Sequence, residues 1–213
     1  MTLGLGTFFP YLFGHPSSGS STSFNIGQSS TPRPTNNIAE IAYQKPEDRP
    51  QQLQGYTLNQ RFSSPEDAVY VNPTSKKVVV GFRGTDNMTD VGTDATGIAL
   101  GMKDSDPRFY NSNRLVQTLK HVYPDYTIET TGHSLGGNLS KYVAEKNPDV
   151  KGIGYNTGSF VPDLFKQNPS NFTSIRTSND VVSLFDRPSN TGGVIQTDTL
   201  NPLASHSVKY FSF

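Results

Sequence analysis

The 213-residue chain contains no cysteine, and its 18 basic and 18 acidic residues give a formal net charge of zero. The absence of cysteine excludes disulfides and thiolate metal sites, and it fits a reducing compartment without requiring one. The balanced charge offers no basic surface of the kind that nucleic acid binds, since the only adjacent basic pair is Lys76-Lys77. We therefore expect a single-domain protein without a nucleic-acid partner.

Long apolar stretches are also missing. No segment reaches the roughly 20 apolar residues that a spanning helix needs, so we expect no transmembrane helix. Residues 1–14 are rich in Phe and Leu, but they lack a basic start and are interrupted by Gly4, Gly6 and Pro10, so we expect no signal peptide. The sequence does not determine the cellular compartment, and we favour a cytoplasmic or assembly-associated protein.

The N-terminal region has a composition of its own. Residues 15–37 consist largely of Ser, Thr, Gly, Pro and Asn, which cannot bury enough apolar surface to order themselves. We predict a Ser/Pro/Gly-rich arm over residues 1–37 and a folded domain over residues 38–213. Large side chains near the start of the arm could anchor it to the domain or to a protein partner. These are Phe8, Phe9, Tyr11, Leu12 and Phe13.

Beyond residue 38, strand and helix patterns alternate. A short polar turn between two apolar runs predicts a hairpin, whose second strand is apolar on both faces and therefore central. A segment with apolar residues at helical spacing then leads into further strands, which predicts an α/β fold with a mostly parallel sheet flanked by helices. The predicted elements are hairpin strands 69–72 and 77–82, helix 109–122, and strands 126–130, 150–155 and 172–177.

The most informative segment is Gly132-His133-Ser134-Leu135-Gly136-Gly137. It lies between the predicted strand 126–130 and a predicted helix over residues 135–146. Glycines two residues to either side of Ser134 remove Cβ atoms that would collide at a sharp turn, and such a turn presents a serine hydroxyl as a nucleophile. Ser134 is therefore the candidate nucleophile.

A serine nucleophile needs a histidine to accept its proton. Of the four histidines, His15 lies in the arm, His121 ends a helix, and His133 points away from its neighbour Ser134. Only His206 follows Ser134, as the order Ser, Asp, His of this architecture requires. We expect His206 to lie in a loop before a short β-like segment over residues 208–211.

The histidine in turn needs a carboxylate to orient it. Asp180 follows strand 172–177, where a parallel strand delivers its loop to the active edge of the sheet. Asp180 is the best candidate and Asp186 is the second, while Asp163 is explained by capping a helix. An oxyanion hole needs two donors, for which we predict Leu135, at the start of the helix, and Thr85, after Gly81-Phe82-Arg83-Gly84.

Four motifs in this order resemble the class 3 (fungal-type) lipase family. They are Phe82-Arg83-Gly84-Thr85, Gly132-His133-Ser134-Leu135-Gly136-Gly137, Asn179-Asp180-Val181-Val182 and the late His206. The resemblance spans roughly residues 40–211 and implies an α/β-hydrolase fold that acts on carboxylic esters, often of lipids. Carried over to these positions, it makes Ser134, Asp180 and His206 the catalytic triad and gives the oxyanion donors as Thr85 and Leu135.

Three positions depart from the family's pattern. Thr130 stands where an apolar residue is preferred, Ser183 where proline is usual, and Gly158 begins a segment without the family's Pro-Arg. The family's lid would fall between residues 88 and 107, where scattered apolar residues alternate with several aspartates. This segment lacks one strongly apolar face, so we expect soluble or short-chain esters as substrates. Its aspartates do not follow a calcium-loop pattern, so no metal or other cofactor is predicted.

The sequence therefore predicts a serine ester hydrolase that works through an acyl-enzyme. An alternative is a structural or interaction protein on a lipase-like fold, whose arm docks into a larger assembly such as a virus shell. Acyl transfer or peptide hydrolysis by the same triad is a third possibility, which the sequence does not separate from ester hydrolysis.

Overall fold

The computed structural model describes residues 34–85, 106–158, 167–183, 186, 193–197, 199 and 201–211. The strands are β1 (Gln52–Leu53), β2 (Tyr56–Leu58), β3 (Asp67–Asn72), β4 (Lys77–Phe82), β5 (Thr127–His133), β6 (Lys151–Tyr155), β7 (Phe172–Thr177) and β8 (Gly193–Ile195). The α-helices are α1 (Pro34–Ile41), α3 (Pro107–Val122), α4 (Leu135–Lys146) and α5 (Pro202–Ser205), and the 3₁₀ helices are η1 (Pro46–Asp48) and η4 (Val208–Phe211).

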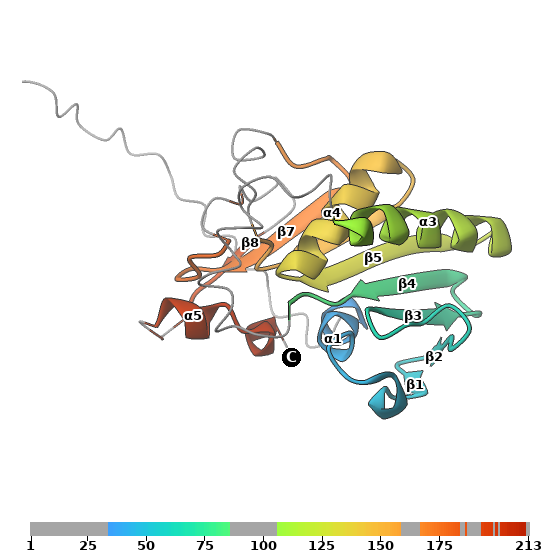
Figure 1. Ribbon diagram of the computed structural model, residues 1–213, viewed down its shortest axis with the longest axis horizontal. Coiled ribbons are helices and arrows are strands. Elements are labelled where there is room, and N and C mark those ends of the chain that lie inside the picture. Colours follow the sequence, from blue (N-terminus) through green and yellow to red (C-terminus); the bar gives the residue numbers. More distant parts are fainter. Residues whose placement is uncertain are drawn as a thin grey trace, which may run out of the picture.

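Within these ranges the strands form one mixed sheet, in which their spatial order follows the chain from β1 to β8 (Figure 1). Neighbours from β1 to β4 pair antiparallel, and neighbours from β4 to β8 pair parallel. The predicted α/β fold with a mostly parallel sheet is therefore confirmed. Because β5, β6 and β7 are parallel, their carboxyl ends lie at one edge of the sheet, where ligands of such sheets bind.

Local sequence explains the elements that lead to this edge. The turn between β3 and β4 contains Lys76 at a φ of 50°, and the side chain of Asn72 accepts a hydrogen bond from the Ser75 amide at 3.0 Å. Helix α3 begins with Pro107 in its first turn, and Asp106 caps it by accepting a hydrogen bond from the Arg108 amide. These are common start signals for a turn and a helix, and they fix where β4 and α3 begin.

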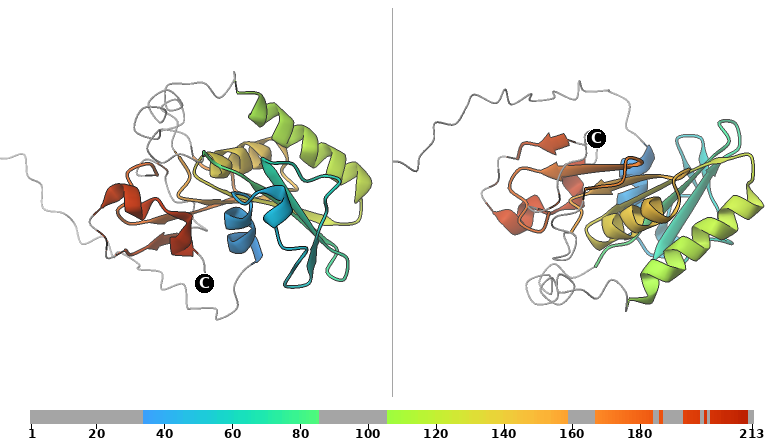
Figure 2. Two further views of the ribbon diagram at one scale, coloured as in Figure 1. Left: turned by 60° about the horizontal axis from the view of Figure 1, so that its bottom comes forward. Right: turned by 90° about the horizontal axis from the view of Figure 1, so that it is seen from above.

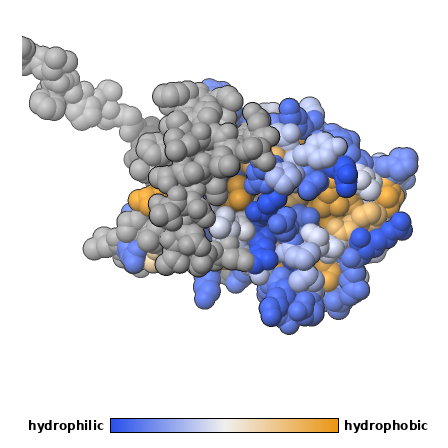
Figure 3. Space-filling model, viewed as in Figure 1, coloured by the Kyte–Doolittle hydropathy of each residue, from blue (hydrophilic) through white to orange (hydrophobic). Residues whose placement is uncertain are grey.

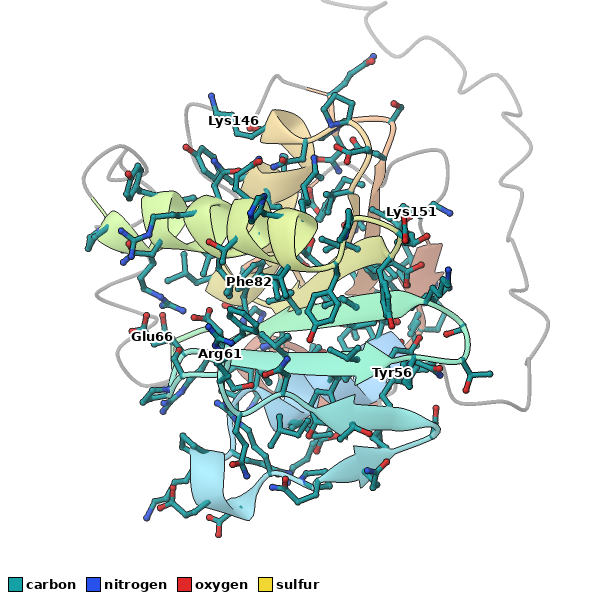
Figure 4. All side chains as sticks on the ribbon, turned by 90° about the vertical axis from the view of Figure 1, so that its right-hand side faces the viewer. Tyr56, Arg61, Glu66, Phe82, Lys146 and Lys151 are labelled. Carbon is teal, nitrogen blue, oxygen red and sulfur yellow. The ribbon has the colours of Figure 1, made fainter. Side chains whose placement is uncertain are left out.

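Helices cover both faces of the sheet (Figure 2). On one face, α3 and α4 pack onto β4 and β5 in a core that includes Phe82, Val116 and Leu139. Figure 4 labels Phe82 on β4, between the sheet and the helical layer. On the other face, Ile38 and Ile41 of α1 pack against β3 and β4, while η4 meets β6 and β7 through Phe211. The central strand β4 is thus buried from both sides, as its apolar sequence predicts.

Three features differ from the expectations. Helix α1 begins at Pro34, inside the segment assigned to the arm, and the boundary between residues 37 and 38 stays a prediction. Residues 208–211, expected to be β-like, form the 3₁₀ helix η4. The short strands β1, β2 and β8 were not predicted, because two or three residues carry no periodicity.

Several predicted segments lie outside the described residues. These are residues 1–33 of the arm, the lid segment up to residue 105, and Asp163. In the part of the chain that is described, no helix combines the length and apolar character needed to cross a membrane. Figure 3 shows a mostly hydrophilic surface with hydrophobic side chains gathered on the side where α3 lies.

Helix α3 offers a matched test of the packing. Val116 is fully buried, whereas Val122 on the same helix is 44% exposed. We expect Val116→Ala to lower the free energy of unfolding by about 2 kcal/mol, because it removes apolar burial and leaves a cavity. Val122→Ala should change it by less than about 0.5 kcal/mol. Denaturant unfolding measures both values, and equal losses would contradict the packing of α3 on the sheet.

Candidate active site

Ser134 occupies a sharp turn between β5 and α4. Its φ is 57° and its ψ is −122°, a conformation that residues other than glycine rarely adopt. The backbone on both sides is fixed, because the Ser134 amide donates to the Tyr155 carbonyl at 3.0 Å and the Ser134 carbonyl accepts from the Gly158 amide at 3.4 Å. The predicted strand, turn and helix around this serine are therefore present.

Two glycines permit this turn. A Cβ on Gly132 would collide with the backbone of Gly136, and a Cβ on Gly136 would collide with the carbonyl of Phe82 at the end of β4. The first turn of α4 thus lies directly against the ends of β5 and β4. This close approach explains the glycine spacing on which the prediction of Ser134 rests.

Asp180 and His206, predicted from separate parts of the sequence, are in contact. The Nδ1 atom of His206 lies 3.0 Å from Oδ2 of Asp180, and both side chains are fully buried. Asp180 follows β7, as expected, and His206 follows α5. A carboxylate on Nδ1 holds the proton there and leaves the lone pair of Nε2 free to accept a proton.

The Asp180 carboxylate accepts further hydrogen bonds. The Val182 amide donates to Oδ1 at 3.0 Å, and the amide and hydroxyl of Ser183 donate to Oδ2 at 3.1 and 2.5 Å. Burial raises the pKa of the Asp180 carboxyl, but the hydrogen bond and charge of His206 and the donors on Ser183 and Val182 outweigh it. The pKa therefore lies below its ordinary value, and the carboxyl is ionised at neutral pH.

The backbone carbonyls of Ser205 and His206 accept hydrogen bonds from residues at the ends of β5, β6 and β7. The Ser205 carbonyl accepts from Asn156 Nδ2 at 3.0 Å and from Thr177 Oγ1 at 2.7 Å, and Asn156 also binds the Thr177 amide. The His206 carbonyl lies 2.5 Å from Nε2 of His133. Sequence reasoning missed Asn156, which follows β6 at a φ of 44°. An asparagine directly after a predicted strand was the available signal.

The remaining contact of the predicted triad is not formed as a hydrogen bond. Among the described residues, no hydrogen bond joins the hydroxyl of Ser134 to His206. The Nε2 atom of His206 is buried without a hydrogen-bond partner. The ring of His133, the residue before Ser134, has its centroid 4.6 Å from that of the His206 ring. Hydrogen bonds between a nucleophile and its base are often long without substrate and shorten only when it binds.

The two predicted oxyanion donors flank the turn. Leu135 is the first residue of α4, where backbone amides have no partner within the helix. Thr85 is half-buried and follows Gly84, and a Cβ on Gly84 would lie 2.7 Å from the His133 carbonyl oxygen. The segment after β4 therefore packs against the turn, which is compatible with the predicted role of Thr85. Both oxyanion roles stay predictions.

The other candidates are placed elsewhere. Asp186 binds the hydroxyl of Ser174 and the side-chain amide of Asn168, not His206. Burial, opposed by the Ser174 hydrogen bond, raises the pKa of Asp186 above its ordinary value. His121 is exposed at the end of α3. No group of three or more potential metal ligands occurs in the described ranges.

Two departures from the family's pattern have local partners. Ser183 supplies the two donors to Asp180 described above, of which a proline would provide neither. Thr130, buried on β5, pairs its hydroxyl with that of Ser140 on α4 at 2.8 Å. A polar residue is thus accommodated at this buried position because its hydroxyl has a partner.

The mixed sheet with helices on both faces agrees with the α/β-hydrolase fold that the resemblance to class 3 lipases implied. Residues 32–203 match the model of a phospholipase-like family, described as the Tle-like phospholipase domain, and the chain belongs to this family. The matched range contains Ser134 and Asp180 and ends before His206.

Solved structures of fungal lipases are similar to the chain. The Lip2 lipase from Yarrowia lipolytica is 18% identical, with a TM-score of 0.53 and 80% of each chain covered. A triacylglycerol lipase from Penicillium expansum is 19% identical, with a TM-score of 0.48, 80% of this chain and 79% of that chain covered. A search of curated proteins gave no match. At such low identity, the likeness to Lip2 shows the fold alone.

The two buried aspartates give opposite pH dependences. Ionised Asp180 has a pKa below the unfolded value of about 3.9, so its stabilisation is complete above that pH and is lost as the pH falls through the folded pKa. The free energy of unfolding of Asp180→Asn should therefore be lower than that of wild type at pH 7. The difference between the two should become smaller as the pH falls through the folded pKa of Asp180. Thermal unfolding between pH 7 and about pH 2 measures this, because the loss occurs below the unfolded pKa.

Asp186→Asn is the matched control. The raised pKa of Asp186 means that ionisation costs stability at neutral pH, and this cost disappears in acid. The stability of Asp186→Asn relative to wild type should therefore improve towards pH 7, opposite to Asp180→Asn. Parallel curves for the two variants would contradict the assigned environments.

Proposed function

We propose that the protein is a serine hydrolase that cleaves carboxylic esters of lipids through Ser134, His206 and Asp180. The observation that carries the proposal is the buried hydrogen bond between His206 and Asp180, at the sheet edge where Ser134 follows β5. A buried carboxylate on one imidazole nitrogen, with the other nitrogen unpaired, is the arrangement of a general base.

The reaction begins when Nε2 of His206 takes the proton of the Ser134 hydroxyl. The serine oxygen attacks the ester carbonyl carbon and forms a tetrahedral intermediate, whose negative oxygen accepts hydrogen bonds from the amides of Leu135 and Thr85. The intermediate collapses, the carbon–oxygen bond to the alcohol breaks, and His206 returns the proton to the leaving alcohol. The acyl group remains on Ser134.

Water completes the cycle by the same route. His206 takes a proton from water, the resulting hydroxide attacks the acyl-enzyme, and a second tetrahedral intermediate forms. Its collapse breaks the bond to the serine oxygen, which recovers its proton from His206, and releases the carboxylic acid. Asp180 stays ionised throughout and stabilises the imidazolium formed in each half-reaction.

The substrate class rests on the family. The family is one of phospholipase-like proteins, and Lip2 is a lipase, so acyl esters of phospholipids are the first class to test. The expected preference for short-chain esters came from the lid segment, most of which lies outside the described residues. A short-chain p-nitrophenyl ester and phosphatidylcholine vesicles together separate the two expectations.

We expect wild-type protein to release fatty acid from phosphatidylcholine or carboxylate from the short-chain ester. Ser134→Ala should lower kcat by about 10⁴- to 10⁶-fold, since it removes the attacking oxygen. Titration of released acid and mass spectrometry of the lipid product measure this, and unchanged thermal unfolding shows that the variant folds. Activity retained by folded Ser134→Ala would contradict the proposal.

The carboxylate is tested by a pair of isosteric variants. Asp180→Asn should reduce kcat by about 10⁴-fold, because an amide does not hold the useful tautomer of His206. Asp186→Asn, a change of the same kind at a buried aspartate without contact to His206, should change kcat by less than about threefold. The reverse order of effects would assign the role to Asp186.

A further inference from the structure

Tyr43 connects three segments of the site that are distant in sequence. It follows α1, and its hydroxyl lies 2.9 Å from Nδ1 of His133. The backbone of Gly84 lies against the same hydroxyl. A Cβ on Gly84 would collide with this oxygen, so the segment that leads to Thr85 approaches Tyr43 as closely as it does only because residue 84 is glycine.

The roles of donor and acceptor along these contacts are fixed. Nε2 of His133 lies 2.5 Å from the His206 carbonyl, which only accepts, so Nε2 carries the proton. Burial, with the neighbouring His206, lowers the pKa of His133 to about 3, so its ring is neutral and Nδ1 is an acceptor. Tyr43 therefore donates to Nδ1 at 2.9 Å, with the His133 carbonyl as a second, more distant acceptor at 3.3 Å. Burial keeps the Tyr43 phenol protonated by raising its pKa.

One line of hydrogen bonds thus runs through the site. It passes from Tyr43, whose hydroxyl lies against Gly84, to His133, and from His133 to the carbonyl of His206, whose own ring donates to Asp180. Its ends are the segment that carries a predicted oxyanion donor and the residue that carries the predicted base. Its middle residue, His133, is bonded in the chain to Ser134.

We propose that Tyr43 and His133 are positioning residues that fix the backbone of His206, and with it the imidazole, relative to Ser134 and Thr85. This proposal rests on the proposed function. Without the Tyr43 hydroxyl, Nδ1 of His133 has no donor. The tautomer with its proton on Nε2, which donates to the His206 carbonyl, is then less strongly favoured over the tautomer with its proton on Nδ1. The backbone of His206 then loses one of its attachments, while the Asp180 contact remains.

A positioning role of the Tyr43 hydroxyl can be separated from a packing role of the Tyr43 ring by a substitution that removes the hydroxyl alone. The Tyr43 ring lies beside His133 with centroids 5.8 Å apart, and Tyr43→Phe keeps that ring while deleting only the hydroxyl. Tyr70 is a matched control, because its hydroxyl also makes a partly buried hydrogen bond, to the Pro50 carbonyl at 2.7 Å, in the core under α1. Tyr70→Phe deletes a comparable bond away from the site.

The first measurement is kinetic. Tyr43→Phe should lower kcat by about 10- to 100-fold with KM within about twofold of wild type, because a small displacement of a catalytic base costs rate rather than substrate binding. Tyr70→Phe should retain wild-type kcat at a similar loss of thermal stability. Equal kcat values for the two variants would overturn the proposal.

The second measurement needs no turnover. Nitrogen-15 NMR of the histidine rings, assigned with His133→Gln, should show His133 neutral with its proton on Nε2 in wild type and in Tyr70→Phe, and a mixture of tautomers in Tyr43→Phe. A His133 proton on Nδ1 in wild type, or no change in Tyr43→Phe, would overturn the hydrogen-bond line. An inactive wild type would instead overturn the proposed function, so the two failures are distinguishable.

His133 itself offers a rescue test. The side-chain amide of Gln can reach as far as Nε2 of His133 and donate to the His206 carbonyl, whereas Phe fills a similar volume without a donor. We expect His133→Gln to retain more of the wild-type kcat than His133→Phe, at matched thermal stability. Equal losses in both variants would mean that His133 acts through packing alone and would overturn its positioning role.

Discussion

The close approach of β4, β5 and α4 around Ser134 is the constraint on which the rest of the structure depends. Gly132 and Gly136 have no room for a side chain, and Ser134 itself adopts a strained positive φ. Strain of this kind persists only where surrounding contacts over-determine it. Here the Ser134 backbone is bonded to Tyr155 and Gly158, so the parallel sheet holds the turn in place.

The same sheet edge assembles the second half of the site. The ends of β6 and β7 supply Asn156 and Thr177, which hold the Ser205 carbonyl, and the loop after β7 supplies Asp180. His206 thus lies in a short segment near the end of the chain, whose backbone is fixed by hydrogen bonds to residues at the strand ends. A loop fixed at its backbone lets one nitrogen of the imidazole bind a carboxylate while the other stays unpaired.

Much of this could be predicted from sequence, for physical reasons that differ by element. The hairpin of β3 and β4, helices α3 and α4 and strands β5 to β7 are long enough to display their periodicity. The β3–β4 turn and the Asp106 cap of α3 agree with it. Residues 208–211 were misassigned because four residues of mixed polarity fit several periods. The contact between Asp180 and His206 could be anticipated because chain order restricts the choice, while their catalytic roles stay predictions.

The contributions of Tyr43 and Asn156 were not predictable in this way. Tyr43 lies 90 residues from its partner His133, and Asn156 lies 49 residues from Ser205, so only the folded chain brings them together. Their own neighbourhoods carry no catalytic pattern. Local sequence therefore marks the groups proposed to react, whereas the groups that hold them are defined by tertiary contacts.

The most direct test of the central claim is covalent labelling with a fluorophosphonate, mapped by mass spectrometry in wild type and in His206→Ala. The account predicts an adduct on Ser134 in wild type and a large loss of labelling in the variant, because a serine hydroxyl needs the histidine to react. An unlabelled Ser134 in folded wild-type protein, or labelling that does not depend on His206, would contradict it.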